Sequence, residues 1–327
     1  MKMIKKALKK MTFISVFIWI LGISLLLSIG AGLYLFNFAI VRKPPLSNEI
    51  LPSASSLSMV MVQSRNDGKL WLNEKNSERL TTIAGDGIEL VGYFVKALET
   101  ESKKLVVLIH GHRSNATMMG NYGKYYYEQG YYVFMADNRG HNESGGNFVG
   151  MGWLDRLDYI IWLDLLINKL GSDIQIVIHG ISMGASTALM ISGEDSAPNQ
   201  IVSIIADCGY SSVAEEFKYQ INNFFHLPAF PILNISSLVS YIFAGYNFKE
   251  ASAIEQVKKI NIPIFIIHGD MDSYNPTYMA YDIYNSIVGE KELWIVPQAE
   301  HGLAYNQNPD EYFRRIWTFL DKYKDQK

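Results

Sequence analysis

Residues 176–185 read IVIHGISMGA, an apolar run that passes into Gly-x-Ser-x-Gly and then into small residues. The apolar run is typical of a buried strand, and the small residues are typical of a helix that packs closely on a sheet. Ser182 then lies in a sharp, strained turn between the two. Glycine is required at positions 180 and 184, because a β-carbon there would collide with the neighbouring strand and helix. The pattern predicts that the hydroxyl of Ser182 projects above a sheet as a nucleophile.

The chain around this turn alternates between strand-like and helix-like stretches. Helical spacing of apolar residues occurs at 153–170, 185–191, 277–288 and 309–323. Short β-rich runs occur at 88–95, 105–110, 132–136, 174–179, 201–205, 264–268 and 292–296. This alternation predicts an α/β fold with a mostly parallel sheet and helices on both faces. In such sheets, ligands bind at the carboxyl ends of the strands.

One aromatic-rich interval interrupts the alternation, between residues 210 and 249. We interpret it as a small helical cap over the site, inserted at about 210–250. The alternative is that its aromatic residues form the core of two additional helices.

An acidic segment and a histidine follow two later strands, in the order Ser, Asp, His along the chain. The strand at 264–267 leads to Asp270 and Asp272, and the strand at 293–296 leads to His301. A histidine can take the proton of a serine hydroxyl at neutral pH and return it to a leaving group, while a carboxylate fixes the imidazole tautomer. We therefore expect Ser182 and His301 to act together as nucleophile and base.

The chain resembles the α/β-hydrolase superfamily over residues 88–323. It is most similar to bacterial membrane-anchored members of the serine aminopeptidase and prolyl-oligopeptidase-like branch, many of which lack an assigned substrate. The resemblance rests on five features taken together: His110-Gly111-His112, residues 137–141 with Ser144, residues 180–184, residues 269–276, and His301-Gly302.

The resemblance implies roles for individual residues. Asp272 matches the family's acid, because it is the second acid of its segment and fits His-Gly-x-x-Asp; Asp270 and Asp207 remain alternatives. The backbone N–H of Met183, at a helix start, is expected to stabilise an oxyanion. The family pattern adds the N–H of His112 as a second donor.

The N-terminus carries 31 residues without charge, 11–41, which are enough to cross a bilayer. A cleaved signal peptide is the alternative, but its apolar region is shorter. Five lysines precede the segment, and only Arg42 and Lys43 follow closely, which predicts a cytoplasmic N-terminus and an extracytoplasmic catalytic domain in the cell membrane. We expect a basic tail at 1–10, a transmembrane anchor at 11–41, an extended stalk at 42–58 and an α/β-hydrolase domain at 59–327.

Composition excludes several other classes of function. The net charge is −3 and no basic stripe is present, which argues against a nucleic-acid partner. The single cysteine, Cys208, excludes an internal disulfide framework and a cysteine-rich metal site.

His110 and His112 are spaced as at the start of a metallo-hydrolase motif, but the acid and histidine that should follow are missing. We expect neither metal nor cofactor.

The sequence thus predicts a serine hydrolase that cleaves an ester, amide or small peptide through an acyl-serine intermediate. Its partners would be a small-molecule or peptide substrate and the membrane. Two alternatives remain open. One is an acyltransferase with the same triad, and the other is a catalytically silent binding protein of the same fold.

Overall fold

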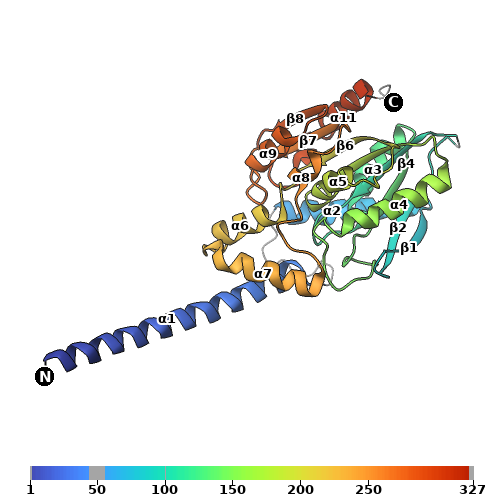
Figure 1. Ribbon diagram of the computed structural model, residues 1–327. Helices are drawn as coiled ribbons and strands as arrows, with labels where there is room; N and C mark the ends of the chain where they lie inside the picture. Colours follow the sequence, from blue (N-terminus) through green and yellow to red (C-terminus); the bar gives the residue numbers. More distant parts are fainter. Residues whose placement is uncertain (1, 44–55, 100, 324–327) are drawn as a thin grey trace.

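A single mixed sheet organises the computed structural model, which describes residues 2–43, 56–99 and 101–323 (Figure 1). Within these ranges eight strands pair in the order β1-β2-β4-β3-β5-β6-β7-β8. The strands are β1 (Glu78–Ile83), β2 (Glu89–Val95), β3 (Lys104–Ile109), β4 (Tyr132–Ala136), β5 (Gln175–Ile181), β6 (Ile201–Asp207), β7 (Ile264–Gly269) and β8 (Lys291–Val296).

The sheet is parallel from β4 through β3, β5, β6 and β7 to β8, whereas the pairs β1–β2 and β2–β4 are antiparallel. The predicted α/β-hydrolase fold is therefore confirmed. The seven predicted strands are all present, and β1 is an eighth that the sequence analysis did not identify. Its side chains alternate between half-buried and exposed at the edge of the sheet, so it lacks the apolar run of the inner strands.

Helices cover both faces of the sheet (Figure 1). The helices of the described residues are α1 (Lys2–Ala39), α2 (Ser56–Glu74), α3 (Gly120–Glu128), α4 (Asp155–Leu170), α5 (Met183–Ser192), α6 (Val213–Asn223), α7 (Ala229–Ala244), α8 (Ala253–Val257), α9 (Tyr278–Ser286), α10 (Ala304–Gln307) and α11 (Pro309–Tyr323), with a 3-10 turn η1 (Ala116–Met119).

The central strand β3 shows how the two faces are filled. Leu105, Val107 and Ile109 belong to the core that includes residues of α4, α5 and α9. Val106 and Leu108 belong to the opposite core, with residues of α2, α3 and α11. Because successive side chains of a strand point to opposite faces, a buried strand between two helical layers must be apolar at every position.

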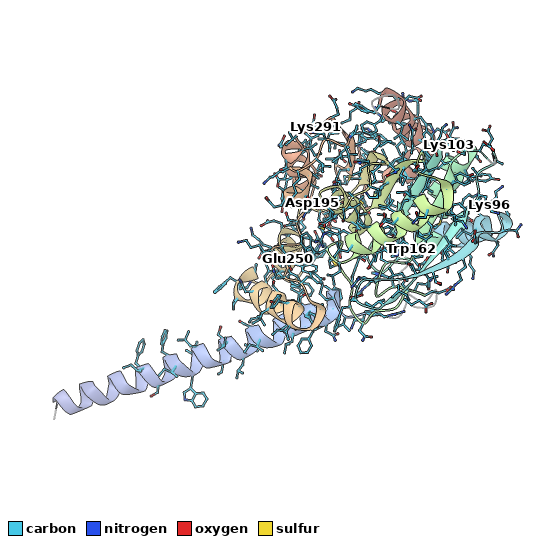
Figure 2. All side chains as sticks on the ribbon, turned by 45° about the vertical axis from the view of Figure 1, so that its right-hand side comes forward. Lys96, Lys103, Trp162, Asp195, Glu250 and Lys291 are labelled. Atoms are coloured by element: carbon cyan, nitrogen blue, oxygen red, sulfur yellow. The ribbon has the colours of Figure 1, made fainter. Side chains whose placement is uncertain are left out.

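Helix α1 extends away from the domain, and Figure 2 shows side chains of its outer part standing clear of everything else. Its stretch Phe13–Ala39 has a mean hydropathy of 2.4 and is long and apolar enough to cross a membrane. The last turns behave differently: Leu35, Phe36, Ala39 and Ile40 are buried against the domain. The helix is therefore continuous from the exposed segment into the core.

The predicted stalk at 42–58 differs from the structure at both ends. Arg42 is fixed to the domain, because its guanidinium donates to the backbone carbonyls of Asn142, Ser144 and Gly146. Ser56 begins α2, which places Trp71 and Leu72 in the core. Residues 44–55 of the predicted stalk lie outside the described residues.

Candidate active site

Ser182 follows β5 directly and precedes α5 in a strained turn. Its backbone has φ 56° and ψ −119°, in the left-handed range that a residue with a β-carbon rarely adopts. A β-carbon on Gly180 would lie 2.1 Å from the carbonyl oxygen of Gly184, and one on Gly184 would lie 2.1 Å from that of Ile109. Both glycines are therefore required by close backbone approach, as the sequence analysis expected.

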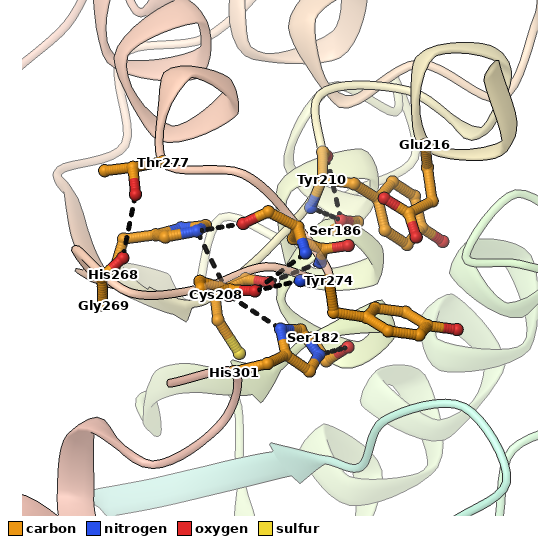
Figure 3. Close-up of polar contacts among 12 residues, drawn as sticks. Ser182, Ser186, Cys208, Tyr210, Glu216, His268, Gly269, Tyr274, Thr277 and His301 are labelled. Atoms are coloured by element: carbon orange, nitrogen blue, oxygen red, sulfur yellow. Dashed lines mark hydrogen bonds and ion pairs between the residues drawn. The ribbon is translucent and has the colours of Figure 1, made fainter. Parts of the chain in front are cut away.

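A chain of hydrogen bonds starts at this serine (Figure 3). Oγ of Ser182 lies 2.8 Å from Nε2 of His301, and Nδ1 of His301 lies 2.7 Å from Oδ2 of Asp272. With its proton on Nδ1, His301 donates to the carboxylate and accepts from the hydroxyl. The three side chains come from the carboxyl ends of β5, β7 and β8, which lie at the same edge of the sheet. This geometry suits removal of a proton from Ser182 during nucleophilic attack.

Asp272 is held as a charged group. Its Oδ1 accepts hydrogen bonds from the backbone N–H groups of Tyr274 and Asn275, at 2.9 and 2.8 Å. Oδ2 also lies 3.3 Å from Nε2 of His268. Burial alone would raise the pKa of Asp272, but the hydrogen bonds of His268 and His301 outweigh burial and lower the pKa to about 2. The carboxylate is therefore ionised at neutral pH.

The two alternative acids have other partners. Oδ1 of Asp270 accepts from the backbone N–H of Gln298, and Asp270 is exposed. Asp207 ends β6, and its Oδ2 accepts from the hydroxyl of Tyr312 at 2.9 Å. Burial raises the pKa of Asp207 to about 6, which disfavours the charged form that an orienting acid needs.

The loop after β3, which carries His112, lies beside the serine. A β-carbon on Gly111 would be 3.7 Å from Oγ of Ser182. Met183 is the first residue of α5, where backbone N–H groups have no partner within the helix. The structure thus places Gly111, the residue before His112, and Met183 next to the nucleophile.

Histidine side chains fix this loop to the one that follows β4. The backbone N–H of Asn138 donates to Nε2 of His110, and that of Arg113 donates to Nε2 of His141. Burial lowers the pKa of His110 to about 4 and that of His141 to about 3, so both rings are neutral acceptors at pH 7. These bonds give the motifs at 110–112 and 137–141 a structural role in holding the loop beside Ser182.

Tyr274 and the end of α1 also lie next to the site. The ring of Tyr274 lies 5.0 Å from that of His301. On the other side, the end of α1 reaches the loop after β3: Nε2 of His112 lies 2.9 Å from the carbonyl oxygen of Ala39, and the guanidinium of Arg113 donates to that of Phe38. About 75 residues separate the partners of the last two contacts, so no local pattern could have indicated them.

A metal at this site is not supported by the chemistry of its donor atoms. Cys208, Asp272 and His301 form the group whose possible ligand atoms lie within 4.8 Å of one another in the described part of the chain. Burial raises the pKa of the Cys208 thiol well above its ordinary value, which disfavours the thiolate that binds metals. The other two atoms are already hydrogen-bonded to each other.

Comparison with known families and sequences identifies relatives of this chain. The model of the prolyl oligopeptidase family matches residues 119–327. The uncharacterized protein YqkD of Bacillus subtilis (strain 168) is 30% identical over 239 residues, which make up 73% of this chain and 77% of that protein.

Solved structures share the fold at lower sequence identity. The esterase Pf2001 of Pyrococcus furiosus superposes with a TM-score of 0.64 at 21% identity, covering 87% of this chain and 98% of the esterase. The acylaminoacyl peptidase of Pyrococcus horikoshii superposes with a TM-score of 0.56 at 18% identity, covering 76% of this chain and 41% of the peptidase.

Proposed function

The chain is a hydrolase that belongs to the prolyl oligopeptidase family of the α/β-hydrolase superfamily, and from this we propose that it cleaves an ester, amide or small peptide through an acyl-serine intermediate. The observation that carries the proposal is the continuous hydrogen-bond chain from Ser182 through His301 to Asp272, with distances of 2.8 and 2.7 Å. Esterase and peptidase activities are named for the two archaeal structures that share the fold, and they define the range of substrates to test.

In the first half of the reaction, Oγ of Ser182 attacks the carbonyl carbon of the substrate. Nε2 of His301 accepts the serine proton as the new C–O bond forms, and the Asp272 carboxylate stabilises the resulting imidazolium. His301 then gives the same proton to the leaving alcohol or amine as its bond to the carbonyl carbon breaks. The acyl group remains on Ser182.

In the second half, water replaces the leaving group. His301 takes a proton from water, the hydroxide oxygen adds to the acyl carbon, and the proton returns to Oγ of Ser182 as the carboxylic acid leaves. Negative charge develops on the carbonyl oxygen in both halves. The backbone N–H groups of His112 and Met183 are our candidates for stabilising it, and donors fixed before the reaction cost no reorganisation.

Covalent labelling tests this proposal. A fluorophosphonate probe reacts with an activated serine and needs no knowledge of the substrate. We expect the full chain in detergent to be labelled, and the Ser182→Ala and His301→Ala variants to remain unlabelled. Ser186→Ala is a matched control, because Ser186 lies one helical turn away and hydrogen-bonds to the backbone of Tyr210. Equal labelling of Ser182→Ala and the unaltered chain would exclude the proposal.

We also propose, from the N-terminal helix, where the protein lies in the cell and which of its segments lie on each side of the membrane. Residues 11–41 would anchor the protein in the cell membrane, with residues 1–10 in the cytoplasm and the hydrolase domain outside, where α6 and α7 cap the site. The length of the apolar stretch and the excess of lysines before it support this assignment. Protease added to intact cells should digest the domain, whereas a domain resistant until lysis would reverse the orientation.

A further inference from the structure

An apolar surface surrounds α7, at the place where α1 enters the domain (Figure 1). We call it the 224–243 face. Its members are large hydrophobic side chains that are 39–76% exposed: Phe224, Phe225, Leu227, Phe230, Leu238, Tyr241, Ile242 and Phe243. The surrounding sequence carries no Asp, Glu, Lys or Arg from Tyr219 to Phe248. Soluble proteins rarely expose so many neighbouring apolar side chains without charged residues among them.

Helix α7 is apolar on its exposed side as well as on its inward side, where Ile232 is buried. Ser236 and Ser240, one turn apart, are completely buried, whereas Leu238 and Ile242 are 58% and 62% exposed. A helix on a water-facing surface turns its apolar stripe to the core and its polar residues outward. In α7 large apolar side chains also face outward, which is favourable in hydrocarbon and unfavourable in water.

The 224–243 face is continuous with the apolar helix α1. Gly32 of α1 approaches Ile235 so closely that a β-carbon on the glycine would lie 2.7 Å from the isoleucine side chain. The rings of Phe36 and Phe243 lie 6.2 Å apart. The helices α1 and α7 therefore form one packed unit, and both Figure 1 and Figure 2 show them side by side.

The uncharged part of α1 is longer than the hydrocarbon of a bilayer is thick, so the packed helices α1 and α7 can both contact the membrane. The uncharged residues 11–39 of α1 extend about 43 Å, whereas the hydrocarbon of a bilayer is about 30 Å thick. The part of α1 that packs on α7 lies at the C-terminal end of this stretch. The face would then lie at the edge of the leaflet from which α1 emerges.

The candidate active site lies between two contacts with this unit. On one side, Phe224 of the face lies 6.2 Å from the ring of Tyr274, which in turn lies 5.0 Å from that of His301. On the other side, the carbonyl of Ala39 in α1 contacts the ring of His112. A molecule in the bilayer next to α1 and α7 would be close to Ser182.

We propose that the 224–243 face inserts into the same leaflet as the end of α1, and that the enzyme takes its substrate from that leaflet, as an acyl ester of a lipid. This rests on the proposed serine hydrolase function. The chemistry is the one described above: the acyl group passes from the lipid's alcohol oxygen to Ser182 and then to water, which releases a fatty acid and a lipid alcohol. The membrane contact of the face does not depend on that chemistry.

A depth measurement on the full chain tests the membrane contact. Cys208, the single cysteine, is buried and is replaced by alanine; new cysteines at Leu238 and Ile242 are labelled with a fluorophore. The labelled proteins are reconstituted into phosphatidylcholine–phosphatidylglycerol vesicles that contain brominated phosphatidylcholine. The matched controls are Leu26→Cys, in the exposed part of α1, and Val288→Cys, 71% exposed and remote from α7.

We expect the bromolipid to quench the labels at 238 and 242 nearly as strongly as the label at 26, and the label at 288 weakly. Quenching at 238 and 242 that equals the value at 288, with full access of iodide from the water, would overturn the membrane contact. This result is independent of whether the protein hydrolyses anything.

A second measurement tests the substrate class. The variant Ile242→Glu places a charge on the face, away from the hydrogen-bond chain. We expect it to lower hydrolysis of a long-chain ester in vesicles about tenfold or more, and to leave hydrolysis of a short, soluble ester unchanged. Equal rates of variant and unaltered chain on the vesicle ester would overturn the lipid substrate. If the unaltered chain hydrolyses neither ester and is not labelled at Ser182, the proposed function falls and with it the lipid substrate, while the quenching still decides the membrane contact.

Discussion

The carbonyl oxygen of Ala39, in the last turn of α1, lies 2.9 Å from Nε2 of His112. Burial lowers the pKa of His112 to about 3, so this nitrogen carries the proton of a neutral ring and donates to the carbonyl. His112 belongs to the loop that we expect to supply an oxyanion donor. The end of the apolar helix is therefore part of the support of the candidate active site.

Two truncations should separate the proposed anchoring role of α1 from its support of the candidate active site. A fragment of residues 31–327 keeps Leu35, Phe36, Ala39 and Ile40, which are buried, whereas a fragment of residues 44–327 loses them. Loss of this apolar burial should lower the free energy of unfolding by about 4 kcal/mol or more. We expect the shorter fragment to unfold at a lower urea concentration and to react more slowly with a fluorophosphonate.

Equal urea midpoints and labelling rates for the two fragments would contradict this prediction. Detergent is kept the same for both, so that solubility of the helix does not enter the comparison.

Exchange of the acid tests the choice among three aspartates. Asp272→Asn should lower kcat on the order of 10³–10⁴-fold, because an amide no longer holds His301 in the required tautomer or stabilises its charged form. Asp270→Asn is the matched control, since Asp270 bonds only to the backbone of Gln298 among the contacts described. Steady-state hydrolysis of an active ester measures both variants. A larger loss of kcat in Asp270→Asn than in Asp272→Asn would show that Asp270, and not Asp272, orients His301.

The elbow glycines should not tolerate a methyl group. In Gly184→Ala the new β-carbon would lie 2.1 Å from the carbonyl oxygen of Ile109, so strand β3 or helix α5 must move. We expect a loss of about 3 kcal/mol in unfolding free energy, measured by urea denaturation. Gly85→Ala is the control, because nothing lies within 4 Å of its β-carbon position. Similar midpoints for the two variants would be incompatible with this packing.

The position of the nucleophile and the order of the partners were predictable because they depend on short local patterns. Gly180, Ser182 and Gly184 obey a backbone constraint that only glycine meets, and each partner follows an apolar strand. The parallel sheet then brings strand ends together, whatever the distance between them along the chain. The fold was predictable because the alternation of strand-like and helix-like stretches is also a local pattern.

Contacts between distant elements were not predictable. The helix α2 contains few apolar residues at regular spacing, so the sequence pattern does not predict it. Its place in the fold becomes evident from Trp71 and Leu72, which are buried in the core. Arg42 was read as part of a stalk, since nothing near it in the sequence indicates the three carbonyls that accept its hydrogen bonds. Such pairings depend on the assembled surface and leave no periodic signal.

A buried acid in α6 should make stability depend on pH. Glu216 has one hydrogen bond, from Gln220 to Oε1, and burial raises its pKa from 4.5 to about 8. The folded state therefore holds this proton more tightly than the unfolded state. The stabilisation is present below pH 4.5 and is lost as the pH rises through about 8.

Glu216→Gln keeps the shape of the side chain and removes its titration. We expect the variant to be more stable than the unaltered chain by more than about 1 kcal/mol at pH 9, and the difference to shrink at pH 5. Urea denaturation at the two pH values measures it. A difference that is the same at both would show that Glu216 does not titrate in this range.

The close approach of Gly32 to Ile235 has a mechanical consequence. A domain on a flexible tether can turn freely and sweep a wide volume around its attachment point. If α1 anchors the chain as proposed, the helix and the hydrolase domain would move as one body, and the domain would spin about the helix axis and tilt with it. The height of Ser182 relative to the end of α1 is fixed by the fold, and an enzyme anchored in this way would sample its surroundings in two dimensions rather than three.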